Sequence, residues 1–510
     1  MALEIKKNTL SVRTSDSKSC AKQSIDTQIN LPDYCSDIKR ILKCCVEPGI
    51  SSVSVKGEKI GAVGGVVIRL IYINDDDNID CCETQLDLDV SCERGNLPEN
   101  PVILAFPKTD YVNCRAMSQR RVSVNGSVAV NFTVLSESKR EFVTHCDNMG
   151  IQLKKDSFKA RNCVCQGSKS FDMSETVSLE GDSPDIGKIL FSDAYCIVES
   201  KKTVTGKMLI KGELVCLIVY CPEKGDSKVF TLRHTMPISQ IIDLAGVEEK
   251  SNCILKLDVN RFMVNAKADS SGKKRLVEIA AKVTAVSLCS EIKEQIGAVD
   301  CYSTDYEINF DSESIDFSVP VQEIKENRTV NKTYEIQGGM KEVCHIRAED
   351  TDTKIQFEND KAKITLSSLL CIIYLNEKGI PSYLEKSFDL ELVQNLPSEK
   401  GRLSGDVYGM IKNLSWSVTG KNNLSVSADV SVEGEICRKF SKKLCVDITV
   451  DEAATKKKDD CAVILYYPQK GEELWSIAKR YNTTIKLLEE ENDLKNKETD
   501  DGMMLIVPTV

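Results

Sequence analysis

A period of about 150 residues constrains the fold of this chain more than any other feature. Three apolar stretches, at residues 66–73, 214–221 and 368–375, carry a tyrosine in their seventh position. These tyrosines, Tyr72, Tyr220 and Tyr374, lie 148 and 154 residues apart. Each stretch runs into a polar turn and then a second extended segment, which is typical of a β-hairpin. Three copies of one long unit therefore account for most of the 510 residues.

A second motif precedes two of the hairpins at the same spacing. Residues 36–42 read Ser-Asp-Ile-Lys-Arg-Ile-Leu and residues 184–190 read Pro-Asp-Ile-Gly-Lys-Ile-Leu. In the first copy Ile38, Ile41, Leu42 and Cys45 follow the spacing of one helix face, with Ser36 placed to cap it. The motif thus predicts a short amphipathic helix before the hairpin, although the third copy, at 338–343, is degenerate.

Polar and apolar residues alternate through most of the remaining sequence. The alternation is clearest over residues 122–134, 277–285 and 424–432, and it predicts antiparallel strands. We therefore expect a mainly β, multidomain protein with three sandwich-like or barrel-like repeats. The boundaries that we assign to them are 1–165, 166–320 and 321–450.

The end of the chain follows a different pattern. Residues 451–460 are polar and charged without an apolar face, which indicates a solvated linker. Residues 461–510 predict a small α+β domain in the order strand, helix, helix, strand, with helices over 472–481 and 484–491. Its expected core consists of Ile464, Leu474, Ile477, Ala478, Tyr481 and Leu488.

Charge and cysteine content limit the functional classes. Lys and Arg total 67 and Asp and Glu total 77, so the net charge is −10, which argues against binding to nucleic acid. None of the 22 cysteines forms a Cys-x-x-Cys pair, and we expect them to be reduced structural thiols. With no apolar signal segment at the start and no apolar run long enough to span a bilayer, we expect a soluble cytoplasmic protein.

The motifs of common enzymes are missing from the sequence. The three histidines, His145, His234 and His345, lack partners at metal-ligand spacing. Residues 181–189 resemble a phosphate-binding loop but have five intervening residues and no Ser or Thr after the lysine. We expect neither a metal nor a cofactor and no enzymatic activity. A site made of acidic residues brought together by the fold stays open as an alternative.

The C-terminal stretch 470–484 resembles the LysM domain. That family has the pattern Gly-Asp-Thr-Leu-Trp-x-Ile-Ala-x-x-Tyr-x-x-Thr, and this chain has Gly-Glu-Glu-Leu-Trp-Ser-Ile-Ala-Lys-Arg-Tyr-Asn-Thr-Thr. The Leu487-Leu488 pair, Asn492 and the final Val507-Pro508 complete the resemblance, which covers nearly all of residues 462–509. LysM domains bind glycans that contain N-acetylglucosamine, so the resemblance implies peptidoglycan as one ligand.

The three upstream repeats resemble the SPOCS domain of clostridial sporulation proteins, through the Pro-Asp-Ile motif and the hairpin tyrosine. Three such domains followed by one LysM domain resemble the clostridial spore coat morphogenetic proteins. The resemblance implies an adaptor in the mother-cell cytoplasm that is recruited to the forespore surface and spore coat. Its implied partners are the stage IV sporulation protein A ATPase, bound mainly through the LysM domain, and other spore coat proteins.

Departures from the LysM pattern favour a protein ligand over a glycan. Glu472 and Glu473 replace the usual Asp-Thr after Gly471, and Met503 lies where the family has a Pro-Gly-Gln turn. Long side chains suit a protein surface better than a compact sugar site. We expect Trp475, displaced from the buried helix face, to be partly exposed as an interface anchor; the alternative is that it packs against the linker or the second helix. The repeats either contact coat proteins or act as spacers.

Overall fold

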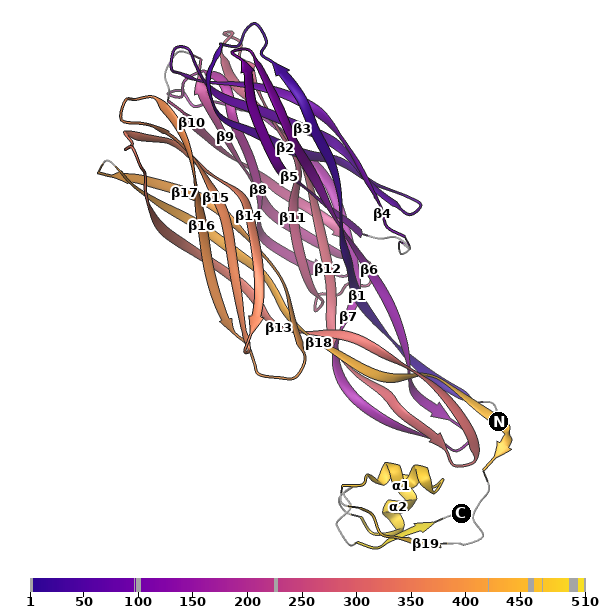
Figure 1. The fold of residues 1–510 in the computed structure, drawn as a ribbon. Helices are drawn as coiled ribbons and strands as arrows, with labels where there is room; N and C mark the ends of the chain where they lie inside the picture. Colours follow the sequence, from indigo (N-terminus) through magenta and orange to yellow (C-terminus); the bar gives the residue numbers. More distant parts are fainter. Residues whose placement is uncertain are drawn as a thin grey trace.

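The protein is an elongated array of β-sheets with a small helical domain at one end (Figure 1). The computed structural model describes residues 3–95, 97, 102–223, 228–420, 422–456, 463–469, 471–494 and 503–508. Within these residues, eighteen strands form six three-stranded antiparallel sheets, two for each of three successive β units. The mainly β architecture expected from the sequence is confirmed, and the sheets do not close into barrels.

The strands of the three β units follow one plan. The first unit contains β1 (Glu4–Asn30), β2 (Ile38–Lys56), β3 (Lys59–Asn74), β4 (Ile79–Glu93), β5 (Val102–Ser118) and β6 (Arg121–Asp147). The second contains β7 (Ile151–Ser178), β8 (Ile186–Val204), β9 (Lys207–Pro222), β10 (Phe230–Asp243), β11 (Asn252–Ala268) and β12 (Lys274–Ser303). The third contains β13 (Tyr306–Glu335), β14 (Glu342–Glu358), β15 (Lys361–Leu375), β16 (Pro381–Asn395), β17 (Arg402–Thr419) and β18 (Asn423–Thr455). Strands β7 and β13 cross the repeat boundaries that we assigned from the sequence.

Each β unit is a sandwich of two sheets. In the first unit the sheet β1-β6-β5 faces the sheet β2-β3-β4, and the orders β7-β12-β11 with β8-β9-β10 and β13-β18-β17 with β14-β15-β16 repeat this arrangement. Residues that alternate along each strand point into the sandwich, as Val122, Val124, Val128 and Val130 of β6 do. This alternation is the period-two pattern that the sequence displayed.

The hairpin motif is almost continuously apolar because it is buried on both faces; in the first copy Arg69 is the exception, and it is paired with Glu47 and Glu83. Leu70 and Tyr72 of β3 belong to the core of the first unit. Ile71 and Ile73, which point the other way, pack against Phe191 and other residues of the second unit. A strand covered on both faces cannot show polar alternation, so this motif marks the junction where the β units meet.

The predicted helix at residues 38–45 is wrong, because this segment is the start of β2. It pairs with β3 through two β-bulges, between Ile38 and Arg40 and between Ile41 and Lys43. Strand β8 has corresponding register shifts between Ile186 and Lys188 and between Ile189 and Phe191. Each bulge adds one residue and shifts the side-chain alternation, which produces the spacing of three that imitated a helix.

The first and last strands of each unit extend beyond the sandwich as a two-stranded ribbon. The three ribbons, at 4–12 with 138–147, 151–160 with 293–303, and 306–317 with 440–455, pack together into what we call the stalk. Its interior contains residues from all three ribbons, including Val143, Cys301 and Ile448 at the end and Phe142, Ala160 and Phe317 nearer the sandwiches. The stalk therefore joins the three units through a shared core.

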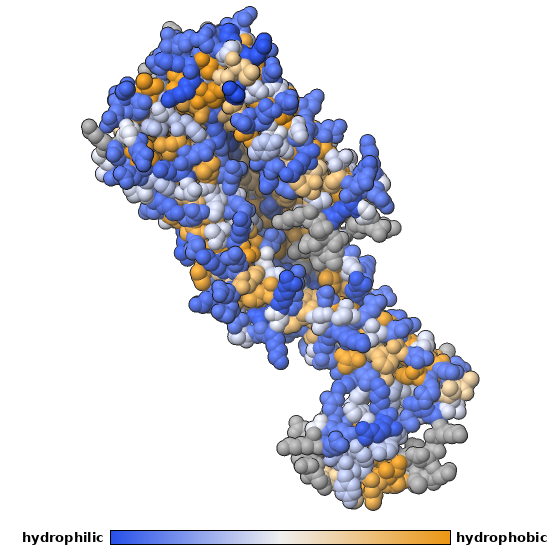
Figure 2. Space-filling model, in the orientation of Figure 1, coloured by the Kyte–Doolittle hydropathy of each residue, from blue (hydrophilic) through white to orange (hydrophobic). Residues whose placement is uncertain are grey.

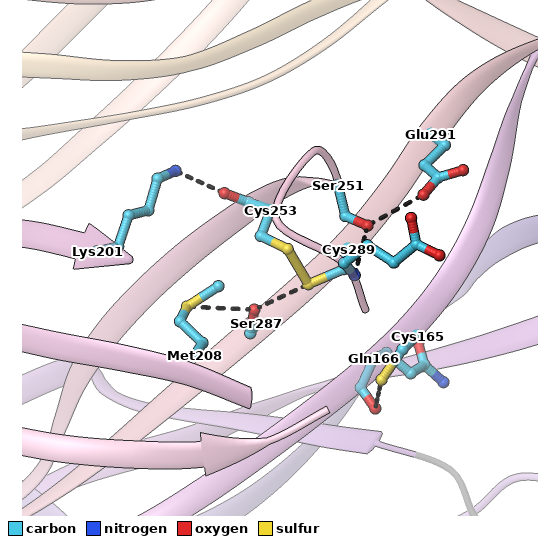
Figure 3. The surroundings of a disulfide bond; sticks show 10 residues. Cys165, Gln166, Lys201, Met208, Ser251, Cys253, Ser287, Cys289 and Glu291 are labelled. Carbon is cyan, nitrogen blue, oxygen red and sulfur yellow. Dashed lines mark hydrogen bonds between the residues drawn. A yellow bond between two sulfur atoms is a disulfide. The ribbon is translucent and has the colours of Figure 1, made fainter. Parts of the chain in front are cut away.

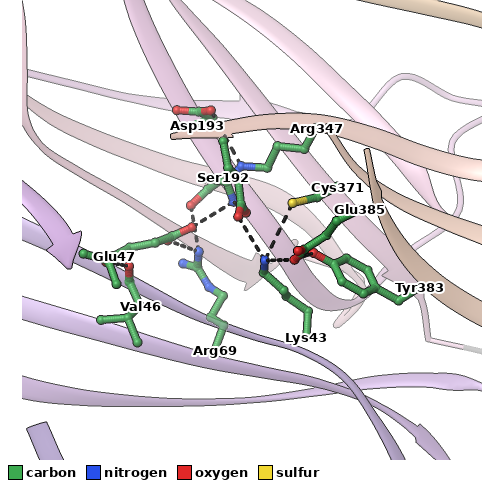
Figure 4. Close-up of polar contacts among 12 residues, drawn as sticks. Lys43, Val46, Glu47, Arg69, Ser192, Asp193, Arg347, Cys371, Tyr383 and Glu385 are labelled. Carbon is green, nitrogen blue, oxygen red and sulfur yellow. Dashed lines mark hydrogen bonds and ion pairs between the residues drawn. The ribbon is translucent and has the colours of Figure 1, made fainter. Parts of the chain in front are cut away.

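A network of charged residues lies where the three sandwiches meet (Figure 4). Arg347 of β14 pairs with Glu47 of β2 at 3.1 Å and lies 3.8 Å from Asp193 of β8. Lys43 of β2 pairs in turn with Glu349, at 3.1 Å, and Glu385, at 2.9 Å, in the third unit. These ion pairs link all three β units.

One pair of cysteines departs from the expectation of free thiols. Cys253 of β11 and Cys289 of β12 lie directly opposite each other and form a disulfide (Figure 3). The expectation failed because cysteines placed opposite on adjacent strands are 36 residues apart in sequence, and their pairing depends on strand register. Cys45, Cys81 and Cys216 are examples of the buried free thiols that were expected.

The C-terminal domain has the predicted order, β19 (Val463–Tyr466), α1 (Leu474–Arg480), α2 (Ile485–Glu491) and β20 (Leu505–Pro508). It forms a separate lobe at the end of the stalk (Figure 2). The expected linker is shorter than 451–460, since β18 continues to Thr455, which lies opposite Tyr306 of β13. Residues 457–460 lie outside the described residues.

Candidate functional site

The candidate site is the C-terminal domain together with the end of the stalk that it touches. The side chains of Leu474, Ile477, Ala478 and Leu488 are buried, and Ile464 and Tyr481 pack against them. Thr484 caps α2 by accepting a hydrogen bond from the backbone N–H of Leu487. The domain thus places α1 and its loop in a fixed position relative to the two-stranded sheet β19-β20.

Trp475 is buried, with 7% of its surface exposed, and not partly exposed as we expected. Its indole N–H donates to Asp300 Oδ2 at 2.7 Å, and its ring lies 4.9 Å from the ring of Tyr302 in an edge-on contact. Both partners belong to β12, so Trp475 packs against the stalk and not against the linker or α2. Sequence reasoning missed Asp300 and Tyr302, because no local pattern links residues about 175 positions away from Trp475.

Further polar contacts surround this tryptophan. Lys479 Nζ donates to Asp300 Oδ1 at 2.6 Å, and Tyr302 OH donates to the carbonyl oxygen of Thr483 at 2.7 Å. Partial burial opposes the charge of Asp300, but the hydrogen bonds from Lys479 and Trp475 outweigh it and lower the pKa of this carboxyl. A charged acceptor therefore satisfies a buried indole N–H at this contact.

The two glutamates that we selected have different surroundings. Glu472 accepts hydrogen bonds from Tyr466 OH at 2.8 Å and from the Gln469 N–H at 3.1 Å, and it pairs with Arg480 at 3.1 Å. Desolvation opposes these contacts, yet together they lower the pKa of Glu472. Glu472 thus stabilises the domain internally, whereas Glu473 is exposed and pairs with Lys154 of the stalk.

The other two residues that we selected lie in the same domain. Gly471 is exposed in a turn with φ of 81°, a left-handed conformation that favours glycine. Met503 is half-buried and packs against the domain core. Gly471 and Met503 consequently differ in what they can contact, since only Gly471 lies fully at the surface.

The outer face of the β19-β20 sheet is apolar. Val463, Leu465 and Tyr467 are 49%, 59% and 62% exposed, and Met504 is 44% exposed. The sequence reasoning did not single these residues out, although apolar residues at successive positions of β19 show that both of its faces are apolar. Apolar side chains that stay exposed together are typical of a protein-binding surface.

The described residues contain no cluster of three or more His, Cys, Asp or Glu side chains able to hold a metal ion. Two cavities, of about 550 and 700 Å³, lie among the β units and not in the C-terminal domain. The three histidines lie on three different strands, β6, β10 and β14. The candidate site is therefore an exposed surface of the C-terminal domain and not part of either cavity.

The fold and the site define a multidomain β protein with a C-terminal binding domain. Comparison with known families identifies its parts: residues 185–267 match the SPOCS domain of SipL, and residues 469–508 match the LysM domain. These matches confirm the two domain types that the sequence motifs indicated, and both families are non-catalytic. Together they support a sporulation-related LysM protein. No curated protein and no solved structure matches the chain.

In the part of the chain that the structure describes, the helices are too short to cross a bilayer.

Proposed function

We propose that this protein is a non-enzymatic adaptor in spore coat assembly. Its LysM domain binds the stage IV sporulation protein A ATPase, and the protein couples assembly of the coat to the forespore surface from the mother-cell cytoplasm. The observation that carries the proposal is the occurrence of a SipL-type SPOCS domain and a LysM domain in one chain. Neither domain alone would favour this role over general glycan binding.

The surface of the LysM domain supports a protein partner. Helix α2 carries Glu490 and Glu491 at its exposed end, and the β19-β20 sheet adds apolar side chains. A domain that exposes both apolar and acidic side chains suits a protein partner with apolar and basic groups on its surface. The alternative is a peptidoglycan-binding protein, which the LysM match itself favours.

A binding experiment on the full chain distinguishes these functions. Immobilised protein is exposed in parallel to the purified ATPase and to soluble peptidoglycan fragments, and binding is followed by biolayer interferometry. We expect binding of the ATPase, and at least a tenfold loss, about 1.4 kcal/mol, in the charge-reversed variant Glu490→Lys/Glu491→Lys. A matched variant on the exposed face of β4, Asp87→Lys/Asp89→Lys, should bind as the wild type does.

Binding of peptidoglycan without binding of the ATPase would contradict the adaptor proposal and establish the wall-binding alternative.

For the β units, we propose that they contact other spore coat proteins. Pull-down of coat proteins by the full chain, retained in the Glu490→Lys/Glu491→Lys variant, would support that role. If the chain captures coat proteins only when the ATPase is bound, the β units act as spacers and the proposed contact is contradicted.

A further inference from the structure

The contact between the LysM domain and the stalk contains a stalk residue that belongs to the core of the LysM domain. Tyr302 of β12 is 2% exposed and lies in one apolar cluster with Leu474, Trp475 and Ile477. It is part of neither stalk cluster. Its burial therefore depends on the LysM domain being docked, and undocking would expose both aromatic rings.

Polar groups fix the orientation of the docked domain. Asp300 receives hydrogen bonds from Trp475 and Lys479, with one on each carboxylate oxygen. On the other side of the contact, Lys456 Nζ donates to Asn482 Oδ1 at 2.7 Å and to the carbonyl oxygen of Ser303 at 3.0 Å. Directional contacts at both edges of an aromatic pair distinguish a specific interface from chance adjacency.

The second ribbon carries side chains for this contact that the first ribbon lacks. Tyr302 lies 27 residues after Arg275, and Asp147 lies 27 residues after Arg120, the arginine at the corresponding place in the first unit. Asp147 pairs with His145 at 2.9 Å, and an aspartate there offers no aromatic surface to Trp475. The second ribbon thus differs from the first at the position where the domain docks.

We propose that the stalk end, through Asp300 and Tyr302, is an autoinhibitory docking surface for the LysM domain of the same chain. The partner of this surface is the α1 face that carries Trp475. A ligand that uses Trp475 must displace the stalk first, so its apparent affinity is reduced by the fraction of molecules that are docked. This inference rests on the proposed function for the identity of that ligand, and it adds the α1 face with Trp475 to the acidic and apolar side chains that we proposed above as its contacts.

Accessibility of Trp475 tests the docking contact without any partner. The chain has two tryptophans, so a Trp416→Phe background leaves Trp475 as the sole indole fluorophore. We expect acrylamide to quench the fluorescence of Trp475 weakly in this background and severalfold more strongly after Tyr302→Asp. This substitution places in the second ribbon the aspartate that the first ribbon has at the corresponding position. Asp300→Asn, which keeps the shape but removes the charge, should give an intermediate value. Tyr306→Asp, at the start of β13 and outside the contact, serves as the matched control.

Limited proteolysis distinguishes release from unfolding, because a released but folded LysM domain persists as a resistant fragment spanning residues 463–508.

Strong quenching in the Trp416→Phe background itself, or equal quenching in Tyr302→Asp, would overturn the docking contact. If Tyr302→Asp increases quenching and also raises the affinity for the ATPase by about tenfold, ~1.4 kcal/mol, the autoinhibition holds. If quenching rises while affinity for the ATPase, bound by the wild type, is unchanged, the docking is not autoinhibitory. A chain that never binds the ATPase refutes the proposed function, whatever the quenching result.

Discussion

At the residue scale, His345 shows how the β units constrain a titratable group. Its ring stacks on Phe191 of the second unit and meets the edge of Trp416 at 6.0 Å. Its Nδ1 is buried and has no hydrogen-bond partner among the residues that the structure describes. Burial, assisted by the nearby charge of Arg347, lowers the pKa of His345 to about 4. The histidine that had no assigned role in the sequence is thus a neutral part of the interface between two units.

This lowered pKa predicts an acid-sensitive interface. The ordinary pKa of histidine is 6.5, so between pH 6.5 and 4 the unfolded chain binds a proton that the native chain does not. Stability is therefore full above pH 6.5 and falls as the pH approaches 4, by up to about 3 kcal/mol. We expect His345→Phe, which keeps an aromatic ring on Phe191, to flatten this part of the pH profile in urea unfolding.

His145→Gln is the control for that experiment, since His145 is half-exposed and paired with Asp147 in the stalk. It should leave the loss of stability between pH 6.5 and 4 in place. A His345→Phe profile as steep as that of the wild type would show that carboxylates alone cause the acid sensitivity.

At the element scale, two glycines allow neighbouring strands to approach closely. A Cβ at Gly64 of β3 would lie 1.9 Å from the carbonyl oxygen of Gly49 in β2. Gly212 of β9, 148 residues later, has the same relation to Ile197 of β8, at 2.3 Å. Both sites adjoin a β-bulge, between Ile50 and Ser52 in one unit and between Val198 and Ser200 in the other. The repeat thus preserves a strand distortion as well as a hydrophobic pattern.

Substitution of Gly64 should therefore damage the first unit. We expect Gly64→Ala to lower the free energy of unfolding by about 2–3 kcal/mol, because backbone atoms must move to admit one methyl group. Gly61→Ala, in the same strand, meets nothing closer than 3.5 Å and should change stability by less than about 0.5 kcal/mol. Thermal denaturation of both variants checks this, and equal midpoints would contradict the close approach.

The elements also show what could be predicted from the sequence. The hairpins, the alternating strands and the order of the LysM elements were predictable, because each depends on a local periodicity. The start of β2 was not, since its bulges gave Ile38, Ile41 and Leu42 a helical spacing. The Cys253–Cys289 pair and the contact of Trp475 with Asp300 depend on strand register and domain packing, which no local pattern encodes.

At the scale of the whole molecule, the three β units behave as parts of one body. They share apolar clusters at the junction of the hairpins and in the stalk. They also share the charged network, in which Arg69 of β3 pairs with Glu47 at 2.6 Å and donates to Ser192 of the second unit at 3.1 Å. Apolar contacts supply most of the association energy, and the directional ion pairs select one relative orientation.

Substitution of Arg347 should show how much the ion pairs, as distinct from the apolar clusters, contribute to holding the three β units together. Its side chain is 17% exposed, and Glu47, Glu349 and Asp193 of three different strands surround it. Arg347→Met leaves Asp193 without its cation, whereas Glu47 keeps Arg69 and Glu349 keeps Lys43. Because a network of partly buried charges is broken, we expect a loss of about 3 kcal/mol. The calorimetric transition should broaden as the third unit unfolds before the others. Adding Asp193→Asn removes the carboxylate that has lost its cation and should recover part of the loss.

The matched change Arg328→Met removes an exposed pair with Glu326 within one unit and should cost less than about 1 kcal/mol. If Arg347→Met costs no more than Arg328→Met, the apolar clusters alone set the arrangement of the units. If it costs more and Trp475 stays shielded from acrylamide, the junction and the LysM contact are independent. That independence is expected because the network lies among the sandwiches, whereas the docked domain lies at the far end of the stalk (Figure 1).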